Sequence, residues 1–385
     1  MRFIHISDTH FDYSPGMNYI DQDKYSDEKF RIFENIIEYA KENKIKLIVH
    51  SGDVFDRINP KLSYISRLMK ILYKAAKDGI SFIIISGNHD QPKIRGTFNP
   101  LELFDQLDNV YVFTEPGIVS IEDTDFVCIP SPREWSKFAE NFNTILNETF
   151  EKYKHESDML VLVTHIQISS ILDKSTLDIE PFIVNGINPD KIPKIFNYVA
   201  LGHIHTKQQI NGRPEMYYAG STSLLSFNEI NTEKYFLDVN IEPKKKPIIK
   251  SIKINLLYDL KELKIDAEKL KTEEDILNSI DYYIKNIKIE NSILKIIFYN
   301  CTDIFYSIID SSKIVSKLKQ YNVLGLKIEL KRNENENALV DATNIDVNNL
   351  VRPVMDELKD YFVAMKEPDI DKLLEMHLKI ITKSD

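Results

Sequence analysis

MRFIHISDTH opens the chain at residues 1–10, where a short apolar run stops at Asp8 and His10. Four later runs have the same form, a β-branched stretch followed by small or polar residues: Lys46–Ser51, Ser81–Ser86, Met159–Thr164 and Tyr198–Leu201. Runs of this kind indicate buried strands. The segments that separate the first three of these runs, Asp27–Lys44 and Lys61–Lys77, have the apolar spacing of helices. Strands that alternate with helices predict an α/β domain.

Further β-branched runs extend this domain toward residue 242. They predict mixed sheets that can pack face to face, with extra strands at Val110–Phe113, Asp125–Ile129, Lys207–Ile210, Met216–Ala219 and Tyr235–Val239. The proline-flanked lysine run Pro243–Pro247 then predicts a boundary, because proline and a charge run interrupt both kinds of pattern. We therefore expect the first domain to span residues 1–242.

Two smaller regions are expected after that boundary. Residues 243–330 predict a small α+β domain with the order Ile248–Leu256 (strand), Glu273–Lys285 (helix), Ser292–Tyr299 (strand), Thr302–Gln320 (helix) and Val323–Leu330 (strand). Residues 331–345 begin with KRNENEN and predict a polar linker. Residues 346–385 contain two short amphipathic helices, Pro353–Phe362 and Pro368–Ile381. Such short helices need either a partner or the body of this chain to bury their apolar faces.

Composition restricts the class of protein. The chain has 385 residues, of which 43% are hydrophobic and 28% charged, so it can bury a sizeable core. It has no signal peptide pattern and no apolar run near the about 18 residues that cross a bilayer, which predicts a cytoplasmic protein without a membrane span. The 2 cysteines exclude a Cys-based metal cluster. Net charge is −10, and residues 241–330 are the net-basic part, with 16 basic and 13 acidic side chains.

Metal-type ligands follow five of the predicted strands: Asp8 and His10, then Asp53, then Asn88 and His89, then His165, and finally His203 and His205. Carboxyl ends of strands in an open α/β sheet meet at one crevice, and residues i and i+2 of an extended chain point the same way. A single Asp or His at a strand end is usually a turn former. Here five of the 9 histidines in the chain follow predicted strands, and this coincidence favours a metal centre instead. His5 and His50, which lie inside strand patterns, are expected to be hydrogen-bonded core groups.

These motifs, in this order, resemble the calcineurin-like metallophosphoesterases. HISDTHFD (5–12), SGDVFD (51–56), SGNHDQP (86–92) and VALGHIH (199–205), followed by YYAGSTSLLSFNE (217–229), are similar to the nuclease subunit of the SbcCD-type DNA double-strand-break repair complex. The resemblance implies a two-sheet αββα metallophosphoesterase fold with a small α+β capping domain and a C-terminal helical pair. It also implies an Mn²⁺-dependent exonuclease and endonuclease.

The same resemblance implies a ligand set for two divalent metal ions. One ion would be held by Asp8, His10, Asp53 and His205, and the second by Asp53, Asn88, His165 and His203, with Asp53 bridging. Oxygen and nitrogen donors without a thiolate suit Mn²⁺, Fe²⁺ or Zn²⁺, and the family implies Mn²⁺. His89 would contact the scissile phosphate and assist the leaving oxygen, and Asp90 would orient His89 or a ligand.

One position departs from the family pattern, because related nucleases commonly have a histidine where this chain has Asp56. We leave Asp56 out of the expected catalytic set. DNA contacts are expected mostly to backbone phosphate, with a contribution from Lys244, Lys245, Lys246, Lys250 and Lys253, although a lysine run is usually a solvated turn.

The resemblance also implies partners. The C-terminal helices would dock on an SMC-like ABC ATPase, and the protein would form a homodimer, for which Lys61–Lys77 could supply the interface. Two other functions stay open. A metallophosphoesterase acting on small phosphodiesters or phosphoproteins could use the same metal site, and a mainly structural subunit could tether DNA. Residues 241–385 argue against the first, and the complete ligand set argues against the second.

Overall fold

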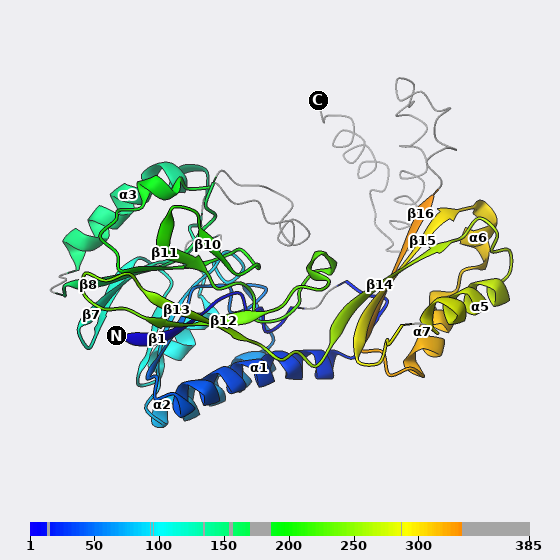
Figure 1. The fold of residues 1–385 in the computed structure, drawn as a ribbon, viewed down its shortest axis with the longest axis horizontal. Coiled ribbons are helices and arrows are strands. Elements are labelled where there is room, and N and C mark those ends of the chain that lie inside the picture. Colours follow the sequence, from blue (N-terminus) through cyan, green and yellow to red (C-terminus); the bar gives the residue numbers. More distant parts are fainter. Residues whose placement is uncertain are drawn as a thin grey trace, which may run out of the picture.

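The computed structural model describes residues 1–13, 16–92, 94, 96–133, 135–153, 157–169, 186–285 and 287–332 (Figure 1). The expected helical pair within residues 346–385, and the expected linker beyond residue 332, lie outside the described residues. Within the described ranges, no helix has both the length and the apolar character that crossing a membrane requires.

The first sheet is built around the N-terminal strand. Its strand order is β13-β12-β1-β3-β4-β5. Strands β1, β3, β4 and β5 are parallel, and β12 and β13 add an antiparallel edge. The bounds are β1 (Arg2–Ile6), β3 (Leu47–His50), β4 (Ser81–Ile85), β5 (Val110–Phe113), β12 (Tyr235–Asn240) and β13 (Ile248–Lys253).

The second sheet has the order β10-β11-β9-β8-β7-β6. Its central strands β11, β9, β8 and β7 are parallel, and β10 and β6 are antiparallel edges. The bounds are β6 (Gly117–Ile121), β7 (Thr124–Ile129), β8 (Met159–His165), β9 (Tyr198–Gly202), β10 (Gln208–Ile210) and β11 (Arg213–Tyr218). The sequence pattern missed β6, which is half exposed and interrupted by polar residues.

The two sheets pack face to face with helices outside. Phe3, Val49 and Val163 belong to the apolar layer between the sheets. Helices α1 (Gln22–Glu42) and α2 (Leu62–Lys77) cover the outer face of the first sheet, and α3 (Trp135–Lys152) covers the second. Short 3₁₀ turns lie at Pro100–Gln106, Pro189–Lys191 and Phe227–Glu229. The expected two-sheet αββα fold is therefore confirmed.

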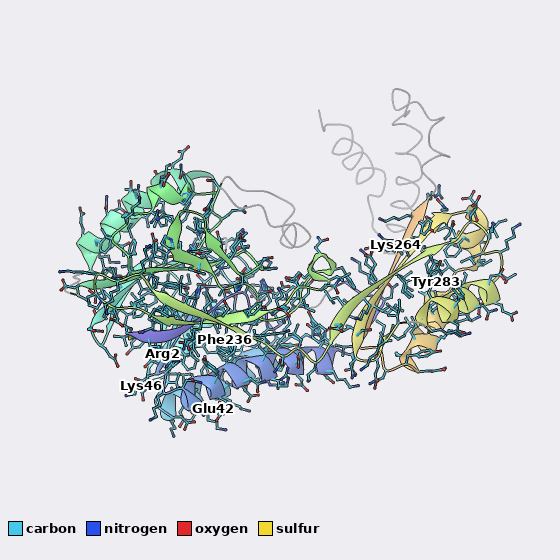
Figure 2. All side chains as sticks on the ribbon, viewed as in Figure 1. Arg2, Glu42, Lys46, Phe236, Lys264 and Tyr283 are labelled. Carbon is cyan, nitrogen blue, oxygen red and sulfur yellow. The ribbon has the colours of Figure 1, made fainter. Side chains whose placement is uncertain are left out.

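Residues 259–332, which we call the cap, supply three strands of a separate four-stranded sheet with helices on one face (Figure 1). Its strand order is β14-β15-β16-β2, and its bounds are β14 (Asp259–Asp266), α5 (Glu273–Ile284), β15 (Ser292–Cys301), α6 (Asp303–Ile308), α7 (Ser311–Lys319) and β16 (Gly325–Arg332). Strand β2 (Tyr19–Ile20) comes from the N-terminal region and pairs with β16. Figure 2 shows Lys264 and Tyr283 on the cap and Arg2 and Phe236 on the first sheet.

Three details of this region differ from the sequence pattern. Strand β13 pairs with β12, so the first sheet extends past residue 242, where we expected the first domain to end. The expected helix Thr302–Gln320 is two helices, because the chain becomes extended at Ile309 and Asp310 caps α7. The sequence pattern missed β14, which forms an edge of the cap sheet. The strand expected at Ile248–Leu256 as part of the small domain corresponds to β13 of the first sheet.

Candidate metal centre

The expected ligands meet at the carboxyl ends of strands from both sheets. Strands β1 and β3 lead into Asp8, His10 and Asp53, and β4 leads into Asn88; β8 and β9 of the second sheet lead into His165 and His203. Three overlapping groups of potential ligand atoms gather here: Asp8, His10 and His205; His10, Asp53 and His89; and Asp8, Asp53 and His165. Asn88 adjoins these groups through its contact with His165, and His203 through its contact with Asn88. We call the seven side chains the ligand cluster: Asp8, His10, Asp53, Asn88, His165, His203 and His205.

Asp53 lies at the centre of the ligand cluster. Its Oδ2 atom is 3.2 Å from Nε2 of His165 and 3.6 Å from Nε2 of His10, so it faces ligands from both sheets. Asn88 Oδ1 is 2.9 Å from Nε2 of His165 and 3.2 Å from Nδ1 of His203. This arrangement places the Asp53 carboxylate between the ligands of the two sheets, where it could serve two neighbouring cations.

Unpartnered ring nitrogens indicate that the cluster is built for cations. Among the described residues, no hydrogen bond reaches either nitrogen of buried His10 or Nδ1 of buried His205, although the Asp56 carboxylate lies 3.3 Å from Nδ1 of His10. The two rings lie in edge contact with centroids 5.4 Å apart. A buried polar atom without a partner is costly, so native structures usually satisfy it. Neutral imidazole nitrogens and carboxylate oxygens are the donors that Mn²⁺, Fe²⁺ and Zn²⁺ accept, and these residues therefore fit a divalent metal.

The backbone of the ligand loops is strained. Asp8, His10, Asp53 and His203 have φ angles of 52°, 42°, 55° and 102°, in the left-handed region that L-residues rarely adopt. Glycine also permits close approach at two points. A Cβ at Gly87 would lie 2.0 Å from Oδ1 of Asp53, and one at Gly202 would lie 2.0 Å from the Ser51 carbonyl oxygen. Strain of this kind is typical of sites where geometry serves function.

Protonation within the ligand cluster follows from burial and from neighbouring charges. Burial raises the pKa of Asp8 to about 6. Burial also opposes ionisation of Asp53, but His165 and His89 hold the pKa of that carboxyl well below its usual range. Burial disfavours the charged form of His165, yet the adjacent Asp53 carboxylate outweighs it and raises the pKa of His165 to about 9. Without metal, the pair is therefore an imidazolium beside a carboxylate.

His89 lies beside the ligand cluster and is more accessible than the ligand histidines. Its side chain is 17% exposed, whereas His10 and His165 are fully buried. Its backbone N–H donates to Oδ1 of Asp53 at 3.0 Å, and its ring Nδ1 is 2.9 Å from the carbonyl oxygen of Asp56. A carbonyl can only accept, so Nδ1 carries the proton and the ring orientation is fixed.

Asp90 contacts the loop of Asp53 rather than the His89 ring. Its carboxylate accepts backbone N–H groups of Val54 at 2.8 Å, Phe55 at 2.7 Å and Gly87 at 3.2 Å. Burial and the nearby Asp53 charge raise the pKa of Asp90 to about 7. Asp90 thus joins the loops that follow β3 and β4 and fixes the turn that presents Asp53.

Asp56 and Gln167 are site residues that the sequence reasoning did not include. Asp56 Oδ1 is 3.3 Å from Nδ1 of His10 and 3.5 Å from Nδ1 of His89, so its carboxylate lies between an expected ligand and the expected catalytic histidine. Gln167 Oε1 is 3.4 Å from Nε2 of His203. The motif comparison pointed to Asp56 as a departure. Gln167, two residues after His165, had no comparable signal.

His5 and His50 lie behind the cluster as expected of core groups. His5 bonds Tyr198 and Ser51, each at 2.9 Å, and Nε2 of His50 is 3.0 Å from Oγ1 of Thr9. Burial lowers the pKa of both histidines to about 3. They are therefore neutral and support the two strands that carry Asp8 and Asp53.

The lysines expected to contact DNA are not gathered at the ligand cluster. Lys244–Lys246 lie in the turn between β12 and β13. This turn is at the amino end of β1, because Asn240, the last residue of β12, pairs with Arg2. The ligand cluster lies at the carboxyl end of β1. Lys250 is opposite Asp238 in the register of the edge strand, and Lys253, at the other end of β13, forms an ion pair with Glu233.

Comparisons with known proteins agree with this geometry. The DNA double-strand break repair protein Mre11 of Saccharolobus solfataricus is 28% identical over 301 residues, covering 76% of this chain and 73% of the relative. Mre11 of Methanococcus maripaludis is 24% identical over 100% of this chain and 96% of its own length. An SbcCD nuclease subunit of Staphylococcus epidermidis is 26% identical, covering 63% of this chain and 66% of the relative.

A protein-family comparison covers more than half of the chain, including every member of the ligand cluster. The model of the calcineurin-like phosphoesterases matches residues 1–207, which end two residues after His205. Enzymes of this family hydrolyse phosphate esters with divalent metal ions, and the donor set of the ligand cluster fits such ions. This chain belongs to the calcineurin-like phosphoesterase family.

Proposed function

We propose that this protein is an Mn²⁺-dependent DNA nuclease of double-strand-break repair, with exonuclease and endonuclease activity. The observation that carries the proposal is the ligand cluster around Asp53 with His89 beside it, in a chain whose relatives are Mre11 proteins and an SbcCD nuclease subunit. A phosphodiester carries negative charge on its non-bridging oxygens, which makes its phosphorus a weak electrophile, and a site of this composition is suited to that substrate.

The ligand cluster divides into two metal positions that share Asp53. Asp8, His10, Asp53 and His205 would hold one ion, and Asp53, Asn88, His165 and His203 the second. When bound, two divalent ions lower the pKa of a water molecule and offset the charge of the phosphoryl oxygens. Nδ1 of His165 is 2.8 Å from the Ser51 carbonyl oxygen, which fixes the proton on Nδ1 and leaves Nε2 as the donor atom of the neutral ring.

His89 would act on the leaving oxygen. The Asp56 carbonyl fixes the Nδ1 proton of His89, so the proton that it can exchange is the one on Nε2. A protonated Nε2 would donate to the departing sugar oxygen as the P–O bond breaks. The Asp56 carboxylate, 3.5 Å from Nδ1, would stabilise the imidazolium form that this step requires. A positioned acid of this kind typically contributes about 10²–10⁴ in rate.

The rest of the chain would serve substrate and partner binding. DNA contacts would be mainly to backbone phosphate, with the cap, residues 259–332 in place of the expected 243–330, covering the substrate. Lys244, Lys245, Lys246, Lys250 and Lys253 belong to the edge of the first sheet and would contribute to DNA contacts along that edge. Residues 346–385 would dock on an SMC-like ABC ATPase, and two copies of the chain would form a homodimer. The names of the relatives support the DNA substrate, and the resemblance in motif order supports the ATPase.

Cleavage of labelled single- and double-stranded DNA, with Mn²⁺ and with EDTA, tests the proposal. We expect cleavage with Mn²⁺ and none with EDTA. Bis-p-nitrophenyl phosphate should be measured in parallel as a small phosphodiester without DNA features. Hydrolysis of that ester together with intact DNA would favour the small-molecule phosphodiesterase, and DNA binding without hydrolysis of either substrate would favour the tethering subunit.

A further inference from the structure

Two buried lysines contact the backbone of two expected ligands. Lys29, on α1, is 1% exposed, and its Nζ donates to the carbonyl oxygen of His10 at 2.5 Å. Lys234, just before β12, is 2% exposed, and its Nζ donates to the carbonyl oxygen of His205 at 3.2 Å. Lysine is seldom fully buried unless its charge is compensated. Both lysines serve the same metal position, the one to which His10 and His205 belong.

Each ammonium group is fixed by further partners. Lys234 pairs with buried Glu229 and donates to Oγ of Ser221 at 2.6 Å. Lys29 lies over the rings of Tyr13 and Tyr25, 5.0 Å from each centroid, in cation–π geometry. These partners fix the two ammonium groups, and through them the two ligand carbonyls.

The partners of both lysines lead to the cap. Tyr25 and Tyr258 each donate a hydroxyl to the carbonyl oxygen of Leu224, at 3.4 and 3.1 Å. Leu224 lies in the same loop as Ser221 and Glu229, and the N–H groups of Leu225 and Ser226 bond Glu229. Tyr25, Leu224 and Tyr258 belong to an apolar cluster that joins α1, this loop and the cap, which we call the interdomain cluster: Tyr25, Leu224, Tyr258, Leu260, Ile293 and Leu324.

Helix α1 provides a second connection between the cap and His10. Its amino end follows β2, which is a strand of the cap sheet, and Asp21 N–H donates to the Leu324 carbonyl at 2.8 Å. Lys29 lies one turn after Tyr25 on the same helix. Figure 1 shows α1 running from beneath the first sheet to the cap. Movement of the cap would therefore displace α1 and the 221–229 loop together.

We propose that Lys29 and Lys234 are positioning residues that hold His10 and His205 and couple this metal position to the cap through the interdomain cluster. The other position has supports that involve neither lysine. His165 is held by the Ser51 carbonyl and the His203 ring by Gln167, while the His203 backbone N–H donates to Asp8 of the first position. Cap displacement by a bound macromolecule would thus change the affinity of one metal position more than that of the other. This inference rests on the two-metal site proposed above.

Calorimetric titration of the metal-free full chain with Mn²⁺ tests the coupling. We expect Lys29→Met to leave one Mn²⁺ at its wild-type affinity and to weaken the other about tenfold to a hundredfold, the usual effect of losing a group that orients a ligand. Lys234→Met alone would leave Glu229 as an unpaired buried charge, so it is combined with Glu229→Gln, and the same result is expected. Electron paramagnetic resonance should show a mononuclear Mn²⁺ signal replacing the coupled pair at limiting metal.

Matched controls separate positioning from general stability. Lys41→Met removes a half-buried lysine of the same helix, whose partner is Asp78 at 2.6 Å, and should leave both affinities unchanged. Tyr258→Phe removes the hydroxyl on Leu224 and should weaken the same single ion. Tyr39 lies on the part of α1 far from the cap, and its hydroxyl donates to Asp238 at 3.0 Å. Tyr39→Phe removes this bond and should leave the affinity for both ions unchanged.

Three outcomes would overturn the inference or its basis. Wild-type protein that binds no Mn²⁺ would refute the proposed two-metal function itself. Wild-type protein that binds two ions, with Lys29→Met and the Lys234→Met/Glu229→Gln variant binding two at unchanged affinity, would refute only the coupling. Equal weakening of both ions, together with a lower urea midpoint of the metal-free variants, would assign the lysines a general structural role and also refute the coupling.

Discussion

Replacing His89 by alanine should abolish most phosphodiester cleavage while both metal ions still bind. The metal prediction follows from the backbone, because the N–H of residue 89, and not its ring, donates to Oδ1 of Asp53 at 3.0 Å. Alanine keeps that bond. The ring itself is 17% exposed, and truncating it loses one hydrogen bond to the Asp56 carbonyl, which costs about 1 kcal/mol of unfolding free energy. The variant should therefore fold.

The size of the rate loss follows from the role of a general acid. Removing a positioned proton donor typically costs about 10²–10⁴ in rate, or about 3–5 kcal/mol of activation free energy. Single-turnover cleavage of a labelled DNA oligonucleotide at saturating Mn²⁺ measures this loss directly, because metal and substrate binding do not limit the rate. Calorimetric titration of the metal-free variant with Mn²⁺ measures the number of ions bound.

His10→Ala is the matched control for this experiment, since the His10 and His89 rings touch with centroids 4.8 Å apart. Removing His10, an expected ligand, should lower Mn²⁺ affinity, whereas removing His89 should not. Loss of an ion in His89→Ala would show that His89 is a ligand, and cleavage within a factor of about three of wild type would remove it from the catalytic mechanism. Either result refutes the assignment.

Three further predictions concern the ligand cluster. Gly202→Ala should lower the unfolding free energy, measured by urea denaturation, by about 1–3 kcal/mol, because the added Cβ would lie 2.0 Å from the backbone oxygen of Ser51. Unchanged stability would show that the two backbone segments can move apart there. Mn²⁺ binding at pH 7.5 should release protons, seen as a binding enthalpy that varies with buffer, because the pKa of His165 is about 9 in the metal-free protein and a ligand must be neutral. Affinity should accordingly rise with pH up to about 9, and a buffer-independent enthalpy would contradict this. EDTA should lower the melting temperature, since Mn²⁺ at a hundred times its dissociation constant stabilises the folded chain by about 2.7 kcal/mol per ion; equal melting curves would argue against metal binding.

Local patterns predicted the strand ends that carry the ligands. Spacing placed Asp8, His10, His203 and His205 at strand ends. The expectation that each i, i+2 pair points the same way from an extended chain does not hold, because Asp8, His10 and His203 lie beyond β1 and β9 at positive φ. The predicted strand Val110–Phe113 coincides with β5, and Leu47–His50 lies within the predicted Lys46–Ser51. Apolar runs of four to seven residues flanked by glycine and polar residues are specific signals. Local patterns do not show that these strand ends lie close together. That prediction came from the general rule that the carboxyl ends of strands in an α/β sheet meet at one crevice.

Non-local pairing explains where the patterns failed. Pro243–Pro247 interrupts the apolar pattern, which favoured a domain boundary, yet the chain turns there and β13 returns along β12. Strand β2 has two residues, too few for any propensity signal, and it exists because β16 offers an unpaired edge. Asp310 ends one helix pattern and begins another, because its side chain accepts N–H groups of Ser312 and Lys313. Each of these features depends on a partner that local sequence does not reveal.

The groups that tune the ligand cluster are the hardest to find by pattern, for a physical reason. A buried lysine such as Lys29 occupies a helix position that looks solvent-exposed in a periodicity analysis, because periodicity assumes that charged side chains face water. Lys29 is buried because a ligand carbonyl and two aromatic rings replace that water. The same holds for the left-handed φ angles of Asp8 and His10, which Asp and His adopt more often than most residues but which a strand pattern does not predict. The metal ligands are predictable from their chemistry, whereas the strain and buried charge that position them can be seen only when the two sheets and the cap are assembled.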